Sequence, residues 1–301
     1  MSDLDRARAA LRSIFGFEDF RPGQDEILSA VLDGEDVFAV MPTGSGKSLC
    51  YQLPAVLGDG LTIVVSPLIA LMANQVAQLR ANGISAAALN SSLTWDETRA
   101  LRDDVSAGRL KLLYIAPERL MMAETQRLLA AAGVARLAVD EAHCISQWGH
   151  DFRKEYLALG DIQEALGAPQ VIALTATADV ATRSDIVARL FRREPRIFVH
   201  GFDRPNIRLA IRRKDGAGTQ IAAFLEEHRG ESGIVYCSTR ARTEEMAATL
   251  AGRGFRAIAY HAGMDMETRA RNLDTFLQED GVVVVATIAL GMGIDKPDVR
   301  F

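Results

Sequence analysis

Short, nearly continuous apolar runs recur along the first two thirds of the chain, separated by longer amphipathic stretches. The runs occupy residues 37–40, 62–65, 112–115, 137–139 and 171–174. Apolar runs of this length without alternation are typical of strands that are buried on both faces of a parallel sheet. Residues 68–82 and 97–107 have helical periodicity and end in Asn-Gly and Ala-Gly, which favour helix termination. Strands that alternate with helices predict an α/β fold.

The same pattern resumes after residue 200. Apolar runs at 234–237, 257–260 and 282–285 predict further strands, and residues 243–253 and 266–276 predict helices. The turn-rich segment 200–206 is the preferred boundary, so we expect two α/β lobes in series, residues 1–200 and 201–301. Residues 298–301 resemble the start of another strand. We therefore expect an incomplete second lobe and a chain that is a fragment of a longer protein.

Composition and charge narrow the class of protein. Of 301 residues, 49% are hydrophobic and 24% charged, which indicates a globular protein and excludes dominant disorder. No stretch approaches the ~18 apolar residues of a membrane span, and the first residues lack the apolar part of a secretion signal. The three cysteines lie far apart, without metal-ligand spacing, which favours a reducing cytoplasm. The net charge is −5 and neither lobe is a basic block, so nucleic acid would need a local binding stripe.

A candidate phosphate-binding loop follows the first apolar run. Residues 41–48 read Met-Pro-Thr-Gly-Ser-Gly-Lys-Ser and match the end of a P-loop, with Met41 where the strict pattern has glycine. Backbone N–H groups of such a loop surround phosphate oxygens at the start of a helix. Lys47 would reach the β- and γ-phosphates, and the Ser48 hydroxyl would bind Mg²⁺. The predicted nucleotide-binding residues here are Thr43, Gly44, Ser45, Gly46, Lys47 and Ser48. The alternative is a glycine-rich turn with a surface lysine.

Two acids, Asp140 and Glu141, follow the apolar run at 137–139. An acid at a strand end beside a P-loop can hold Mg²⁺, directly or through water, and a second acid can orient the attacking water. We assign Asp140 to the metal, largely through water, and Glu141 to the water, which makes Lys47, Asp140 and Glu141 the predicted catalytic residues. The alternative is that the two acids cap the next helix.

An aromatic and basic segment follows the two acids directly. Within residues 143–153 lie His143, Trp148, His150, Phe152 and Arg153. Aromatic rings stack on single-stranded bases and arginine contacts phosphate, so this loop is a candidate DNA-binding element that repositions Glu141. The alternative is that Trp148 and Phe152 fill the core.

The run 140–153, Asp-Glu-Ala-His-Cys-Ile-Ser-Gln-Trp-Gly-His-Asp-Phe-Arg, resembles RecQ-family DNA helicases of superfamily 2. Further stretches resemble motifs of that family in order, at residues 15–24, 66–72, 114–120, 173–178, 235–240 and 286–297. The resemblance covers essentially the whole chain. It implies two RecA-like P-loop lobes in tandem, each a parallel sheet flanked by helices, with the second lobe incomplete.

The resemblance implies roles for residues outside the phosphate loop. Gln24 would read the adenine edge, with help from Arg21, and Phe17 would stack on the base. The alternatives are core packing for Phe17 and a plain surface position for Arg21. Thr175 and Thr177 would couple the nucleotide site to DNA, although helix capping is an alternative for Thr177.

In the second lobe the resemblance implies that Ser238 and Arg240 bind a DNA phosphate and that Asp295 lies toward the ribose. A turn aspartate is the alternative for Asp295. Leu290 replaces an aromatic residue that is frequent in the family. The family's later arginine motif and its zinc module would lie beyond residue 301, so zinc is not expected here and hydrolysis by this chain alone is in question.

The implied function is an ATP- and Mg²⁺-dependent DNA helicase that moves 3′ to 5′ on single-stranded DNA, separates duplex DNA and acts in repair and recombination. It would be a monomer in the bacterial cytoplasm or nucleoid, with a single-stranded-DNA-binding protein as a further partner by family resemblance. Three alternatives stay open: a nucleotide-dependent DNA-binding core without turnover, a superfamily 2 RNA helicase and, less well supported, a P-loop kinase.

Overall fold

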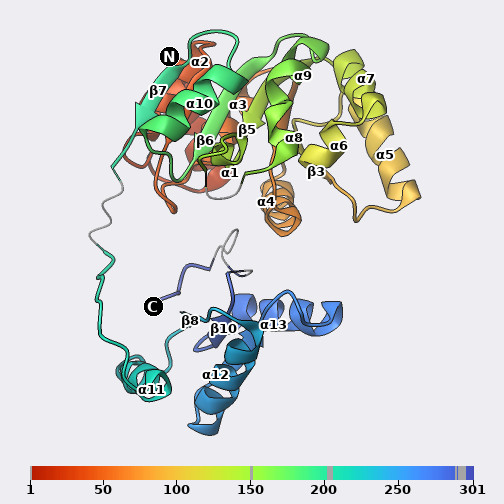
Figure 1. The fold of residues 1–301 in the computed structure, drawn as a ribbon. Helices are drawn as coiled ribbons and strands as arrows, with labels where there is room; N and C mark the ends of the chain where they lie inside the picture. Colours follow the sequence, from red (N-terminus) through yellow and green to blue (C-terminus); the bar gives the residue numbers. More distant parts are fainter. Residues whose placement is uncertain (1, 150–151, 202–205, 289, 291–295) are drawn as a thin grey trace. The chain divides into compact units, whose positions relative to one another are not determined.

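The structure is a computed structural model that describes residues 2–149, 152–201, 206–288, 290 and 296–301 (Figure 1). The chain divides into two compact units, Met1–Arg204 and Pro205–Phe301.

The first unit is built on one seven-stranded sheet. Its strands are β1 (Val37–Val40), β2 (Leu61–Val65), β3 (Ala86–Leu89), β4 (Leu112–Ile115), β5 (Val134–Val139), β6 (Gln170–Thr175) and β7 (Arg196–Val199). Their order across the sheet is β3-β4-β2-β5-β6-β1-β7, and every neighbouring pair is parallel. All seven carboxyl ends therefore meet at one edge, and the segments that follow them form one continuous rim.

Helices cover both faces of this sheet. They are α1 (Asp3–Phe15), α2 (Gln24–Leu32), α3 (Leu49–Leu57), α4 (Ile69–Ala81), α5 (Trp95–Ser106), α6 (Pro117–Leu120), α7 (Ala123–Ala132), α8 (Lys154–Leu157), α9 (Leu159–Ala165) and α10 (Val180–Leu190), with a 3₁₀ helix, η1 (Ala142–Ile145). Along β1, Val37 and Ala39 pack with α2, α3 and α4, whereas Phe38 and Val40 pack on the opposite face. Burial on both faces explains why these strands are continuously apolar.

The second unit contains a smaller parallel sheet. Its strands are β8 (Gly233–Tyr236), β9 (Ala257–Tyr260) and β10 (Val283–Ala286), in the order β8-β10-β9. Its helices are α11 (Ala217–Glu227), α12 (Arg240–Gly252) and α13 (Met266–Gln278). Leu250 of α12 and Phe276 of α13 are fully buried in two separate apolar clusters.

The α/β prediction is confirmed, and so are the parallel sheets. Strands predicted at 37–40, 112–115 and 257–260 have those bounds, and the other predicted strands differ by one to three residues at an end. The four predicted helices correspond to α4, α5, α12 and α13. Strands β3 and β7 were not predicted.

Candidate nucleotide and nucleic-acid site

The phosphate loop connects β1 to α3. The departure from the strict P-loop pattern has a structural reason, because the Met41 side chain is fully buried in the apolar layer with α3 and α4. Its backbone N–H donates to the carbonyl of Thr175, at the end of neighbouring β6 (3.0 Å). Residue 41 therefore continues the strand, and the turn around a phosphate starts only after it.

Gln24, the first residue of α2, holds the middle of this loop. Its Nε2 donates to the carbonyl oxygens of Ser45 (3.0 Å) and Gly46 (2.9 Å), and the side chain is almost completely buried. Gly46 has φ +77°, and a Cβ there would lie 2.5 Å from Gln24 Nε2. The backbone angle therefore favours glycine at residue 46, and a larger residue there would also displace the Gln24 amide.

Lys47 is half-buried and points back into its own loop. Its Nζ donates to the carbonyl oxygens of Met41 (3.3 Å) and Pro42 (3.4 Å). Burial lowers the pKa of Lys47, and the nearby carboxylates of Glu141 and Asp140 oppose that shift. A lysine held in this way against its own loop differs from the surface lysine of the alternative interpretation.

The two acids follow β5. The Asp140 backbone N–H donates to the carbonyl of Val65 (2.9 Å), and its Oδ1 accepts from the Glu141 N–H (3.0 Å). Burial raises the pKa of Asp140 to about 7; the Glu141 carboxylate adds to this shift, and Lys47 opposes it. A cation would compensate the charge of such a carboxylate, which fits Asp140 as a metal ligand.

Glu141 occupies the N-cap position of η1, but its side chain makes no capping hydrogen bond. The helix-cap alternative is therefore wrong for Glu141. Instead Oε2 lies 3.3 Å from His143 Nδ1. Its backbone is in the left-handed region, with φ +51° and ψ +47°, which is uncommon for a residue with a side chain. This turn directs the carboxylate back toward His143.

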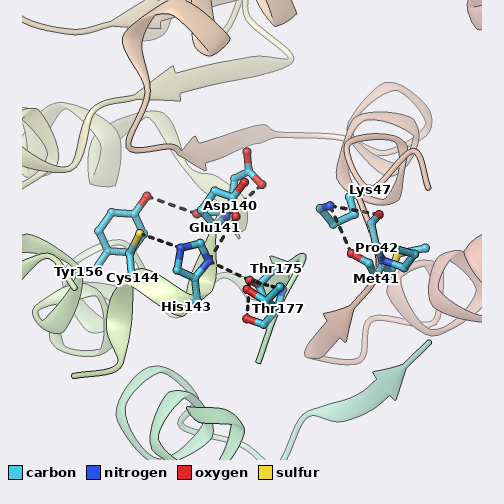
Figure 2. A network of polar contacts seen from close by, with 10 residues as sticks. All are labelled: Met41, Pro42, Lys47, Asp140, Glu141, His143, Cys144, Tyr156, Thr175 and Thr177. Atoms are coloured by element: carbon cyan, nitrogen blue, oxygen red, sulfur yellow. Dashed lines mark hydrogen bonds and ion pairs between the residues drawn. The ribbon is translucent and has the colours of Figure 1, made fainter. Parts of the chain in front are cut away.

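A buried polar network connects Glu141 to β6 (Figure 2). His143 Nδ1 lies 3.0 Å from Thr175 Oγ1, and the Thr175 hydroxyl donates to the carbonyl of Thr177 (3.2 Å). Since that hydroxyl has a single proton, it accepts from His143, which places the ring proton on Nδ1. The same N–H faces the Glu141 carboxylate, so His143 bridges the acid and β6.

Two members of this network were missed by sequence reasoning. The Tyr156 hydroxyl donates to the carbonyl of Asp140 (3.3 Å), and Cys144 Sγ lies 3.8 Å from His143 Nε2 (Figure 2). Tyr156 is fully buried, so its role was indistinguishable in the sequence from ordinary core packing.

The aromatic segment continues from this network along the same rim. Trp148 is 76% exposed, so the core alternative is wrong for it, and Phe152 is half-buried. Arg153 donates to the carbonyl of Pro67, in the loop after β2 (3.1 Å). His150 lies outside the described residues.

The candidate adenine residues lie around the start of α2. Phe17 is 48% exposed, which excludes a buried core position. The Arg21 backbone N–H donates to Gln24 Oε1 (2.8 Å), and its guanidinium donates to the carbonyl of Gly44. Arg21 is thus exposed yet fixed on the phosphate loop. Thr177 is exposed and does not cap α10, because Asp179 accepts from the Thr182 N–H there (2.7 Å).

Comparison with known proteins agrees with this geometry. The DEAD/DEAH box helicase model matches residues 21–186, and the helicase conserved C-terminal domain model matches residues 217–301. The chain belongs to the DEAD/DEAH box helicase family. It is 48% identical over 295 residues to the ATP-dependent DNA helicase RecQ of Haemophilus influenzae, covering 98% of this chain and 48% of that protein. With RecQ of Bacillus subtilis it shares 40% identity over 300 residues, covering 99% and 50%.

The resemblance to RecQ helicases is therefore confirmed, and the chain spans about half the length of these relatives. The structure of the Mycobacterium smegmatis helicase Lhr bound to single-stranded DNA and AMP-PNP has a TM-score of 0.72, with 23% identity, and covers 99% of this chain and 43% of that chain. That likeness confirms the fold of a two-lobed helicase.

Two of the residues predicted to bind in the second unit, Ser238 and Arg240, lie at the carboxyl end of its sheet. Ser238 follows β8 and is exposed, and Arg240 begins α12, where it covers Gly263. Asp295 lies outside the described residues. His261 is buried and contacts Glu244 Oε1 (3.0 Å). Within the described ranges no group of three His, Cys, Asp or Glu residues could hold a metal ion.

No helix in the described part of this helicase chain is both long and apolar enough to cross a membrane.

Proposed function

We propose that this chain is the motor of an ATP-dependent DNA helicase that moves 3′ to 5′ along single-stranded DNA and separates duplex DNA. The observation that carries the proposal is that Glu141, which His143 bridges to Thr175, stands seven residues before the exposed Trp148 in the chain. A hydrolytic carboxylate and a base-stacking surface are thus parts of one short segment. The identity with RecQ helicases supports DNA as the nucleic acid.

The residues of the loop fit a nucleotide phosphate. The Ser45 hydroxyl is buried and has no hydrogen-bond partner among the described residues, and Lys47 Nζ makes only long contacts with loop carbonyls. Both are donors that phosphate oxygens would satisfy. The backbone of residues 43–48 would surround the phosphates, with Phe17 and Arg21 toward the base. Gln24 would read the adenine edge only after its amide leaves the carbonyl oxygens of Ser45 and Gly46, which use both of its protons.

The residues Ser48 and Asp140 fit a hard divalent cation, since Mg²⁺ prefers oxygen ligands and retains several waters. When bound, Mg²⁺ would neutralise charge that develops on the transferred phosphoryl group. Asp140 would hold it largely through water, and its raised pKa is consistent with a carboxylate that needs a cation nearby.

Glu141 would orient the attacking water and accept its proton. The His143 N–H holds the Glu141 carboxylate in place, and Thr175 fixes the ring in the tautomer that donates. Stacking of a base on Trp148 would move the backbone that follows His143. Strand binding would therefore reach Glu141 through His143.

The described side chains that we propose to contact the strand are all at least partly exposed. Trp148, Phe152 and Arg153 would contact bases and phosphate, with His150 as a further member, and Ser238 and Arg240 would bind a phosphate. We further propose that the protein acts as a monomer in the bacterial cytoplasm, in DNA repair and recombination, with a single-stranded-DNA-binding protein as a partner.

The test is ATP turnover with Mg²⁺, measured without nucleic acid, with single-stranded DNA and with single-stranded RNA. We expect DNA to stimulate turnover at least about tenfold and RNA to have little effect, and Lys47→Ala to remove turnover. Trp148→Ala should lose the stimulation by DNA. The matched control is Trp95→Ala on α5, where the tryptophan is 72% exposed, and this variant should keep the stimulation.

Equal stimulation by RNA would favour an RNA helicase. Nucleotide binding without turnover would indicate a DNA-binding core that needs further residues. Stimulation that survives Trp148→Ala would contradict the coupling through the aromatic segment.

A further inference from the structure

A buried glutamine lies in the apolar layer behind the phosphate loop. Gln52 of α3 is 7% exposed. The surrounding layer is apolar and is formed by Cys50, Tyr51 and Ala55 of α3 with Met72, Val76 and Leu79 of α4. A polar group in such a layer requires partners, because it has lost its contact with water.

Gln52 has two such partners, and they belong to two different elements. Its Nε2 donates to Gln75 Oε1 on α4 (2.7 Å) and to the Tyr114 hydroxyl on β4 (2.9 Å). An amide nitrogen has two protons, so both are used. A shift of α3 relative to α4 would leave a buried donor without an acceptor, so these bonds fix the spacing of the two helices.

On the α3 side, the Gln52–Gln75 contact lies one helical turn from the phosphate loop. The Gln52 backbone N–H donates to the carbonyl of Ser48, the residue assigned to Mg²⁺ (2.9 Å). Ser48 and Gln52 are thus joined by one backbone hydrogen bond of α3.

On the α4 side, the contact leads to the loop after β2, because α4 begins directly after that loop. Pro67 in that loop accepts a hydrogen bond from Arg153 of the aromatic segment (3.1 Å). A continuous series of contacts thus runs from Ser48 through Gln52 and Gln75 to α4, and from Pro67 to Arg153.

We propose that Gln52 is a positioning residue that couples nucleotide binding at the phosphate loop to single-stranded DNA binding at the aromatic segment, through α4. The inference rests on the proposed function, since it assumes that the two sites bind these ligands. It adds a route behind the phosphate loop that is separate from the Glu141–His143–Thr175 bridge.

The test measures coupling in the 301-residue chain and not turnover. The dissociation constant of a fluorescein-labelled oligo-dT strand is measured with and without AMP-PNP and Mg²⁺, and the ratio of the two constants is the coupling factor. We expect a factor of at least about fivefold for the unmodified chain. Gln52→Leu should reduce it to below about twofold while changing AMP-PNP affinity by less than about threefold.

A second variant and a matched control separate coupling from general packing. Gln75→Leu removes the same hydrogen bond from its other partner, at a half-buried position. The double variant Gln52→Leu/Gln75→Leu should have a coupling factor no smaller than that of either single variant, because both substitutions remove one interaction. Gln163→Leu replaces a buried glutamine of α9, which packs on the opposite face of the sheet and donates to the carbonyl of Leu190. This control should keep the full coupling factor.

The possible results are distinguishable. Failure of the unmodified chain to bind AMP-PNP or the strand overturns the proposed function, and the inference with it. Three other results overturn the inference alone. The unmodified chain could bind both ligands without coupling, or Gln52→Leu and Gln75→Leu could keep the full coupling factor. In the third case Gln163→Leu loses as much of the coupling factor as they do.

Discussion

The two units build parallel sheets with very different degrees of burial. In the first unit, strands β1, β2 and β4 are buried at every position, between helices on both faces. In the second, the central strand β10 is likewise buried at every position, but β9 is half-buried throughout, and Tyr236 at the end of β8 is 54% exposed. A strand buried on both faces gains apolar contact along its whole length, so the first unit is expected to be the more stable and the better suited to fix a catalytic network.

The largest effect should come from the chemistry assigned to the first unit. Glu141→Gln retains the size of the side chain but removes the carboxylate that we propose to act as the base. We expect turnover to fall by at least about 100-fold with AMP-PNP affinity nearly unchanged. The matched control is Glu226→Gln on α11, at an exposed carboxylate paired with Arg229 (2.7 Å). A comparable loss in the control would show that hydrolysis depends equally on the second unit.

Core truncations in each unit sharpen the comparison of stability. Leu137 of β5 and Leu250 of α12 are both fully buried. Leu137→Ala should lower the free energy of unfolding of the first unit by about 3 kcal/mol, and Leu250→Ala should act on the second unit alone. Denaturant unfolding followed by hydrogen exchange assigns each transition. If both variants shift one common transition, the units unfold together and the contrast between them is wrong.

The pH dependence of stability should come from the first unit as well. The pKa of Asp140 is about 7 in the folded chain against the ordinary 3.8, so the folded state holds a proton that the unfolded state has released. Stability must then decrease as the pH rises between these values. Between pH 5 and pH 8 the unmodified chain should lose about 2 kcal/mol relative to Asp140→Asn.

That experiment is denaturant unfolding at the two pH values, without nucleotide or Mg²⁺. The same pH dependence in both proteins would mean that Asp140 is already ionised at pH 5 in the folded chain.

The smallest expected effect concerns the exposed end of β8. The Tyr236 hydroxyl donates to the carbonyl of Leu290 (2.6 Å). Tyr236→Phe should destabilise the second unit by about 1 kcal/mol. In the described part of the chain the Tyr260 hydroxyl has no hydrogen-bond partner, so Tyr260→Phe on β9 is the control and should have no effect. Destabilisation of the first unit by Tyr236→Phe would contradict the separation of the two units.

The sequence predicts the strands that carry continuous apolar runs, and it misses two others for physical reasons. Strand β3 begins with three alanines, which favour helix in isolation, and only its pairing with β4 makes it a strand. Strand β7 is an edge strand in which Ile197 and Val199 are about half exposed, so it lacks the pattern of a buried strand.

The candidate site likewise contains residues that the sequence predicts and contacts that it does not. Lys47, Asp140 and Glu141 belong to contiguous motifs at strand ends, and such motifs are visible in a linear sequence. The contacts Tyr156–Asp140 and Gln52–Gln75 join residues on different elements. They depend on the order of strands and helices in space, and a single sequence gives no sign of which buried tyrosine or glutamine will meet which partner.

The left-handed backbone of Glu141 has a consequence for engineering this chain. Among the described residues only Glu141 and Ala168 combine a side chain with a positive φ. Such a backbone costs of the order of 1 kcal/mol, which glycine or asparagine would largely avoid. A library selected for folding alone would therefore enrich glycine or asparagine at residue 141. A library selected for turnover would retain glutamate, so the two selections would diverge at this position.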